Sequence, residues 1–192
     1  MPSLTEVANL ALALLGEDRV SSLSTDNSKP SRLCNEMLPQ VRDRCLSEHP
    51  WNFAIRRSAD LPALATAPAW GFTAAYQVPA DCIRVLSLDA ADPHEPWRRE
   101  GNSVLCNLSA PINLRYVARI TDSGAWSPAF VDLVAATLAE RLAMPLAASQ
   151  GARDAITRYA ELQRVRARAI NAAEGIPLPQ YAPADAYIDA RA

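Results

Sequence analysis

The stretch His49-Pro50-Trp51-Asn52-Phe53-Ala54 (HPWNFA) decides the fold, because the pattern of the chain changes there. On its N-terminal side, apolar residues recur at the spacing of a helix. Beyond it, from Trp51 to Arg119, apolar and polar residues alternate in several short segments. Pro50 lacks a backbone N–H and disfavours helical backbone at His49. The sequence therefore predicts a helix that ends at His49 and an α+β fold.

Two helices are predicted before this point. Ser3-Leu4-Thr5-Glu6 has the pattern of a capping box, and Gly16 is suited to a left-handed helix end, which predicts a helix over about 4–15. A second helix is expected over about 28–46, with Pro30 in its first turn and Pro39 bending it. The apolar stripe expected on the first helix is Leu4, Val7, Leu10, Ala11 and Leu14.

The segment after Trp51 predicts one small antiparallel sheet of four to six strands, since several turn signals separate its alternating segments. Residues 60–71 have the composition of an irregular loop. The turns are expected at 79–81, 92–93 and 100–102. The expected strands cover 72–78, 83–88, 103–108 and 112–118, and residues 52–56 could begin the β region.

Helical periodicity returns after residue 124. Ser127 can cap a helix with Pro128 in its first turn, and this helix is expected to reach about Ala148. A fourth helix is expected over about 152–174, with Asp154 and Arg158 as an i,i+4 ion pair. Its expected core stripe is Ile156, Tyr159, Leu162, Val165 and Ala169.

These elements predict a four-helix bundle with an antiparallel β-sheet insertion between the second and third helices, followed by an extended C-terminal tail. Residues 1–49 and 121–174 would form the helical domain, and residues 50–120 the β-rich insertion. Residues 175–192 are rich in proline and alanine, so this tail is expected to become ordered on a partner. Trp51 and Trp126 lie where helices meet the sheet and are expected to pack these two joints.

Composition narrows the functional classes. The net charge of −2 argues against strong non-specific binding to DNA by the whole surface, and no apolar run is long enough to cross a bilayer. Cys34, Cys45, Cys82 and Cys106 form no CxxC pair, so buried reduced thiols are expected, with no metal and no cofactor. The protein is expected to be made in the cytoplasm.

Catalytic motifs are sparse in the sequence. It contains no GxxxxGK[ST] or GxGxxG loop, no GxSxG elbow and no HExxH pair. Cys45 and His49, one helical turn apart, are the best candidates for a nucleophile and base. The carboxylates near the strand ends could bind a cation, although solvated turns explain them as well; they are Asp89, Asp92, Glu95 and Glu100.

An ordered series of segments resembles the tail tubular protein A family, the head-to-tail adaptors of short-tailed phages. The series spans about residues 3–174, and its most specific parts are HPWNFA and Tyr76–Val85. The segments are Leu4–Gly16, Arg42–Ala54, Tyr76–Val85, Leu114–Val117, Thr121-Asp122 and Trp126–Phe130.

The resemblance implies a structural virion protein that is not an enzyme. Such a subunit would form a homo-oligomeric ring, a 12-mer in the family, between the portal protein and the tail nozzle protein at the portal vertex. Genomic double-stranded DNA would pass through the ring without sequence-specific binding. The tail would then dock on the portal through Ile176, Leu178, Tyr181, Tyr187 and Ile188. Alternating charge on the fourth helix makes Arg153, Arg158, Arg164 and Arg168 candidates for inter-subunit contacts.

Two alternatives remain open at this point. One is another phage head-completion or connector protein, for which the large β insertion is unusual. The other is a small enzyme that uses Cys45 and His49. Substituting Cys45 with serine would distinguish the enzyme from both structural proteins.

Overall fold

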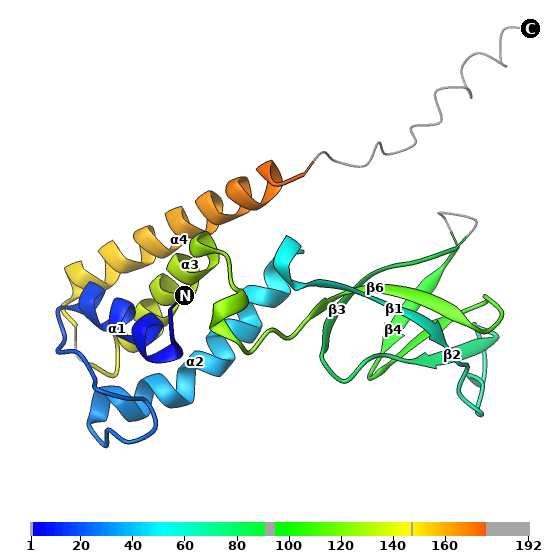
Figure 1. Ribbon diagram of the computed structural model, residues 1–192, viewed down its shortest axis with the longest axis horizontal. Coiled ribbons are helices and arrows are strands. Elements are labelled where there is room, and N and C mark those ends of the chain that lie inside the picture. The colour runs from blue at the N-terminus through cyan, green and yellow to red at the C-terminus, as the bar shows by residue number, and fades with distance from the viewer. Residues whose placement is uncertain (1, 91–94, 147, 176–192) are drawn as a thin grey trace, which may run out of the picture.

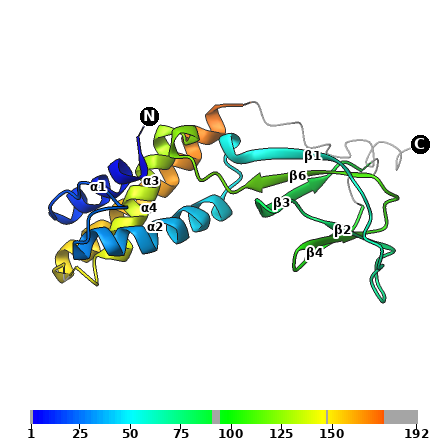
Figure 2. The same cartoon turned by 60° about the horizontal axis from the view of Figure 1, so that its bottom comes forward.

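The computed structural model describes residues 2–90, 95–146 and 148–175, and within them the chain is a mixture of helices and antiparallel sheets. The molecule is elongated, with the helices at one end and the sheets at the other (Figure 1, Figure 2). The expected α+β content is therefore confirmed. The helices of the described part are α1 (Leu4–Leu15), α2 (Lys29–Glu48), α3 (Pro128–Leu142) and α4 (Gln150–Ala173).

Helix α1 begins and ends as its sequence predicts. The backbone N–H of Ser3 donates to the Glu6 carboxylate at 2.6 Å, and the Ser3 hydroxyl accepts from the N–H of Glu6, which completes the capping box. Gly16 adopts a left-handed conformation with φ 73° and ends the helix. Helix α2 continues through Pro39, whose exposed position leaves the missing N–H on the solvent side.

Helix α3 is the centre of the helical part. It packs against α1, α2 and α4, and ten of its fifteen residues are buried, as expected for a central helix that is apolar on most sides. The arrangement is three helices around a central one, and the regular four-helix bundle expected from the sequence is not shown. Helix α3 ends at Leu142, earlier than predicted, because Pro145 disfavours helical backbone at Met144.

The six strands of the described part form two three-stranded antiparallel sheets, so the prediction of one sheet is wrong. Alternation marks strands but does not encode which strands pair. The first sheet has the order β1-β6-β3 and the second has the order β2-β5-β4. The strands are β1 (Ile55–Leu61), β2 (Ala74–Gln77), β3 (Cys82–Leu88), β4 (Trp97–Glu100), β5 (Ser103–Cys106) and β6 (Ile112–Ala118).

Two strands were missed or shortened in the sequence-based prediction, and both lie at sheet edges. Strand β4 was not predicted, and β1 extends to Leu61, into residues expected to be a loop. Both carry adjacent arginines, of which Arg56, Arg57 and Arg98 are exposed; charged residues are common at edges and remove the apolar alternation.

The joints between helices and sheets meet on one aromatic cluster. Trp51 and Trp126 are both buried, and their rings lie 5.1 and 5.4 Å from the ring of Phe130. The indole N–H of Trp51 donates to the carbonyl of Cys45, and that of Trp126 donates to the carbonyl of Ile120. The expectation that these tryptophans pack the joints is confirmed. The chain passes between the helices and the sheets twice, and both passages pack on Phe130.

Candidate functional site

The predicted site residues fall into two groups. Ile176, Leu178, Tyr181, Tyr187 and Ile188 lie outside the described residues, so their predicted contact with a portal stays a prediction. The four arginines of α4 are described, and they differ strongly in their surroundings.

Arg164 and Arg168 are engaged inside the chain. The carboxylate of Glu48, at the end of α2, accepts from Nε of Arg164 at 3.1 Å and lies 3.7 Å from the guanidinium of Arg168. Arg164 also pairs with Glu161, and its side chain is mostly buried. These ion pairs fasten α4 to the last turn of α2, where the HPWNFA joint begins.

The same joint holds the end of α4 through amide side chains. Nδ2 of Asn171 lies 3.1 Å from Nε2 of His49, and the Asn171 side chain also accepts from the N–H of Asn52 at 2.8 Å. Nδ2 of Asn52 reaches the carboxylate of Glu174. The C-terminal end of α4 is therefore held against the HPWNFA joint by these hydrogen bonds.

Arg153 and Arg158 take no part in this network. Arg153 contacts the sulfur of Met144, and Arg158 is exposed. The predicted ion pair of Asp154 with Arg158 is absent from the described residues; Asp154 accepts instead from Nε2 of Gln150 at 2.8 Å. Arg158 is thus left available for a contact outside the chain.

Cys45 and His49 do not form a nucleophile–base pair. The Cys45 thiol donates weakly to the hydroxyl of Thr137 at 3.8 Å, while the His49 ring is bonded to Asn171. Burial raises the pKa of Cys45 to about 11, which is the wrong direction for a nucleophilic thiolate. The pKa of His49 is lowered by burial and by Arg168 and Arg84. The geometry gives no support to the enzyme alternative at this pair.

The carboxylate candidates are also explained without a ligand. Asp89 accepts from Nδ2 of Asn113 at 3.1 Å, Glu95 and Glu100 are at least partly exposed, and Asp92 lies outside the described residues. Across the described ranges 2–90, 95–146 and 148–175, no group of three or more acidic, histidine or cysteine side chains could hold a metal ion. In the same ranges no helix is long and apolar enough to cross a membrane.

The outward side of α4 exposes more large apolar side chains than is usual for a protein that functions as a monomer. The predicted core stripe of this helix is largely wrong, because the residues that face α3 are Ile156, Ala160, Gln163 and Ala167. Leu162 and Val165 are 62% and 59% exposed. We define the α4 outer face as Tyr159, Leu162, Val165, Ala169 and Ile170, all of which are exposed.

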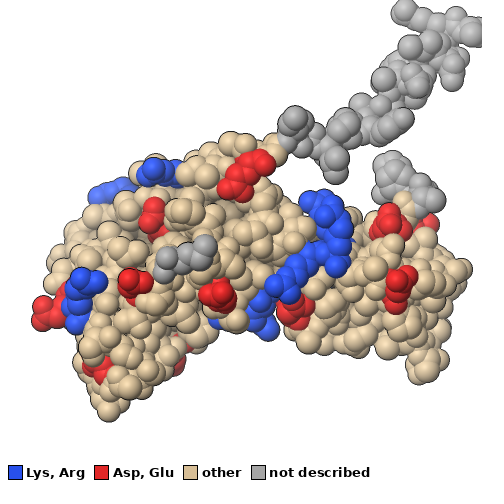
Figure 3. All heavy atoms as spheres, in the orientation of Figure 1, with Lys and Arg blue, Asp and Glu red and all other residues tan. Residues whose placement is uncertain are grey.

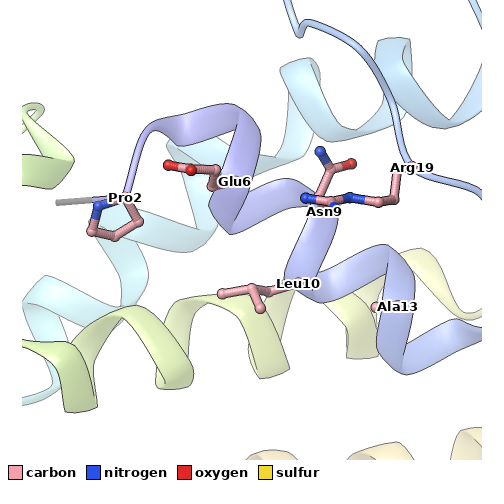
Figure 4. A pocket seen from close by; sticks show the side chains of 6 residues that line it. All are labelled: Pro2, Glu6, Asn9, Leu10, Ala13 and Arg19. Carbon is pink, nitrogen blue, oxygen red and sulfur yellow. The ribbon is translucent and has the colours of Figure 1, made fainter.

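A second apolar surface lies on α1. The helix buries Val7, Ala8, Ala11 and Leu12, so two leucines of its predicted stripe point outward. These are Leu10 and Leu14, which are 47% and 39% exposed. A hollow of about 610 Å³ lies beside them, and Figure 4 shows Leu10 and Ala13 among the residues that line it. Its lining is completed by Pro2, Glu6, Asn9 and Arg19.

The first sheet carries unneutralised positive charge. Arg57 of β1 and Arg115 of β6 stand directly opposite each other, beside a hollow of about 390 Å³. Neither guanidinium has an ion pair with the described residues, and Nε of Arg115 is shielded from solvent without a hydrogen-bond partner there. Figure 3 shows basic side chains gathered in a band where the helical and β parts meet.

Neither comparison with known proteins assigns the chain to a family. No protein-family model matches it, and no curated protein is significantly similar to it.

Proposed function

We propose that this chain is a structural virion protein, the subunit of a head-to-tail adaptor ring that joins a phage portal to the tail nozzle. The ordered sequence resemblance names this role. The observation that carries it is the α4 outer face, since a chain that works alone rarely leaves a row of large apolar side chains in solvent.

In this proposal the four helices act together as one bundle, residues 1–49 and 121–174, that carries the ring contacts. The β-rich insertion, residues 50–120, projects from it. The C-terminal tail from residue 175 is the arm that docks on the portal, and the ring encloses a channel for double-stranded DNA. The thiols of Cys34 and Cys45 are buried, and burial raises their pKa values to about 11. Such unreactive thiols suit a structural protein without covalent chemistry.

The direct test is assembly of the purified full-length chain, alone and with the portal protein of the same phage genome. Native mass spectrometry would give the stoichiometry, and electron microscopy would show a ring against the portal. A chain that stays monomeric at every concentration and ignores the portal would overturn the proposal.

A variant pair makes the same test specific to the surface that carries the proposal. Leu162→Ser with Val165→Ser should abolish assembly and leave the circular dichroism spectrum unchanged, because these side chains are mostly exposed and do not belong to the hydrophobic core. The matched control is Trp70→Ser, which also removes an exposed apolar side chain but lies in the β part. Equal loss of assembly in the control would point to general solubility effects and contradict the assignment of the interface to α4.

A further inference from the structure

We propose that the α4 outer face of one copy packs into the hollow beside α1 of the next copy, so that subunits join head to tail. This inference rests on the proposed function, and names the contact through which the subunits would assemble.

Helix α4 carries apolar side chains both toward α3 and toward solvent. The inner side packs on α3 through Ile156, Ala160 and Ala167. At helical spacing Leu162, Val165 and Ala169 of the α4 outer face lie on the far side of the helix, and Tyr159 and Ile170 border the inner side. A helix that needs only one partner is expected to have one apolar stripe and a polar remainder. The second stripe therefore indicates a second helical partner.

The α1 side offers a matching surface. Leu10, Ala13 and Leu14 recur at spacings of three and four, so they line one side of α1. Figure 4 shows Leu10 and Ala13 on this side. The hollow is open, as a ridge of large side chains from another helix requires, and the small side chain of Ala13 leaves room for it.

Charge complements the two surfaces. Arg158 and Arg166 lie among the apolar residues of the α4 outer face, are exposed and form no ion pair with the described residues. The α1 surface is flanked at its C-terminal end by Glu17 and Asp18, which form no such pair either, and Glu6 lies at the other end. Arg19 is the opposing charge on that side, so carboxylates outnumber guanidinium groups there.

The contact must join different copies. In one chain α1 and α4 both pack on α3 and have almost no contact with each other, so the exposed α4 outer face is not covered by its own α1. A contact between unlike surfaces is heterologous, and repetition of such a contact closes a ring when the rotation permits it. A symmetric contact of α4 with α4 would instead bring the arginines of both copies together, which opposes association.

Charge reversal distinguishes these arrangements. Arg158→Glu with Arg166→Glu, and separately Glu17→Arg with Asp18→Arg, should each weaken self-association of the full-length chain at least tenfold in sedimentation velocity. The chain with all four substitutions should recover most of the wild-type association, because the charges at positions 158 and 166 again oppose those at positions 17 and 18. The control Arg98→Glu reverses an exposed arginine of β4 and should leave association unchanged.

Cross-linking gives a second measurement that does not depend on affinity. A mixture of chains carrying Leu10→Cys and chains carrying Leu162→Cys should form mixed dimers with a short bismaleimide, and each chain alone should form few. The four native cysteines are buried and should not interfere.

The outcomes separate this inference from the proposed function. Assembly that persists unchanged in both reversal variants, with no mixed cross-link, would overturn the α4–α1 contact and leave the ring intact. Cross-links in the Leu162→Cys chain alone would show the symmetric contact instead. A wild-type chain that neither self-associates nor binds the portal would remove the proposed function, and this contact with it.

Discussion

Asn9 is expected to be the polar side chain of α1 on which the fold depends most. It is buried, its Nδ2 donates to the carbonyl of Val20 at 3.0 Å, and its Oδ1 accepts from the N–H of Val20 at 2.8 Å. Asn9 thereby satisfies both backbone groups of a buried loop residue and holds the segment after α1 against the helix. We expect Asn9→Ala to remove both bonds and leave both Val20 groups without a partner.

The size of the effect follows from these two groups. An unsatisfied buried backbone group costs about 1–3 kcal/mol, so the pair should cost about 2–4 kcal/mol once some water enters the space. Replacing asparagine by alanine inside a helix returns up to about 0.7 kcal/mol of helix propensity. The net loss should be roughly 1.5–3 kcal/mol, a large share of a typical stability of about 5–15 kcal/mol.

Asn35→Ala is the matched control. Asn35 also lies inside a helix, is exposed, and its side chain forms no hydrogen bond with the described residues, so its substitution should be neutral or slightly stabilising. Urea unfolding of dilute protein, followed by tryptophan fluorescence, would compare the midpoints at equal m-value. Free energies of unfolding for the two variants within about 0.5 kcal/mol of each other would refute the reasoning.

Three further predictions concern the joints, the first sheet and the thiols. Trp51→Phe leaves the buried carbonyl of Cys45 without its 2.8 Å donor and should cost about 1–3 kcal/mol in urea unfolding; no loss would show that the ring alone anchors the joint. Arg57→Thr removes a like charge directly opposite Arg115 and should raise stability by about 0.2–1 kcal/mol, which thermal unfolding would detect; a decrease would show that the pair is neutralised. Burial raises the pKa of Cys34 and Cys45 from 9.0 to about 11, so their contribution to stability is full below pH 9 and is lost as pH rises towards 11. Unfolding midpoints at pH 8 and 10.5 should therefore differ less in the Cys34→Ala, Cys45→Ala variant, and an equal difference would assign the loss to other groups such as Tyr76 and Tyr116, whose pKa values burial also raises.

Local signals predicted the ends of elements well. The capping box at Ser3, the stop at Gly16 and the cap at Ser127 depend on neighbouring residues alone, and each was found in the expected place. The edge strands β1 and β4 were harder because their exposed arginines remove the alternation on which prediction depends. The division into two sheets depends on pairing between distant strands, which no local pattern contains.

The candidate interface was missed for a different reason. Sequence reasoning assigns the largest apolar side chains to the core, and in both α1 and α4 that rule chose residues which the folded chain exposes. Alanines take many of the buried positions instead: Ala8 and Ala11 lie beside Val7 and Leu12 on α1, and Ala160 and Ala167 lie beside Ile156 on α4. Small residues allow helices to approach closely, so a rule that favours large apolar side chains underestimates these positions.

The placement of the large side chains then becomes informative. If solubility of a single chain were the only constraint on these helices, their outer positions would be polar, since leucine and valine in solvent gain nothing and favour aggregation. Leu162 and Val165 on α4, and Leu10 and Leu14 on α1, occupy those positions instead. Local rules that fail at one place in an otherwise regular fold tend to mark function. Here they fail on two helices with opposite flanking charge that have almost no contact with each other within one chain, which is the arrangement that a head-to-tail assembly requires.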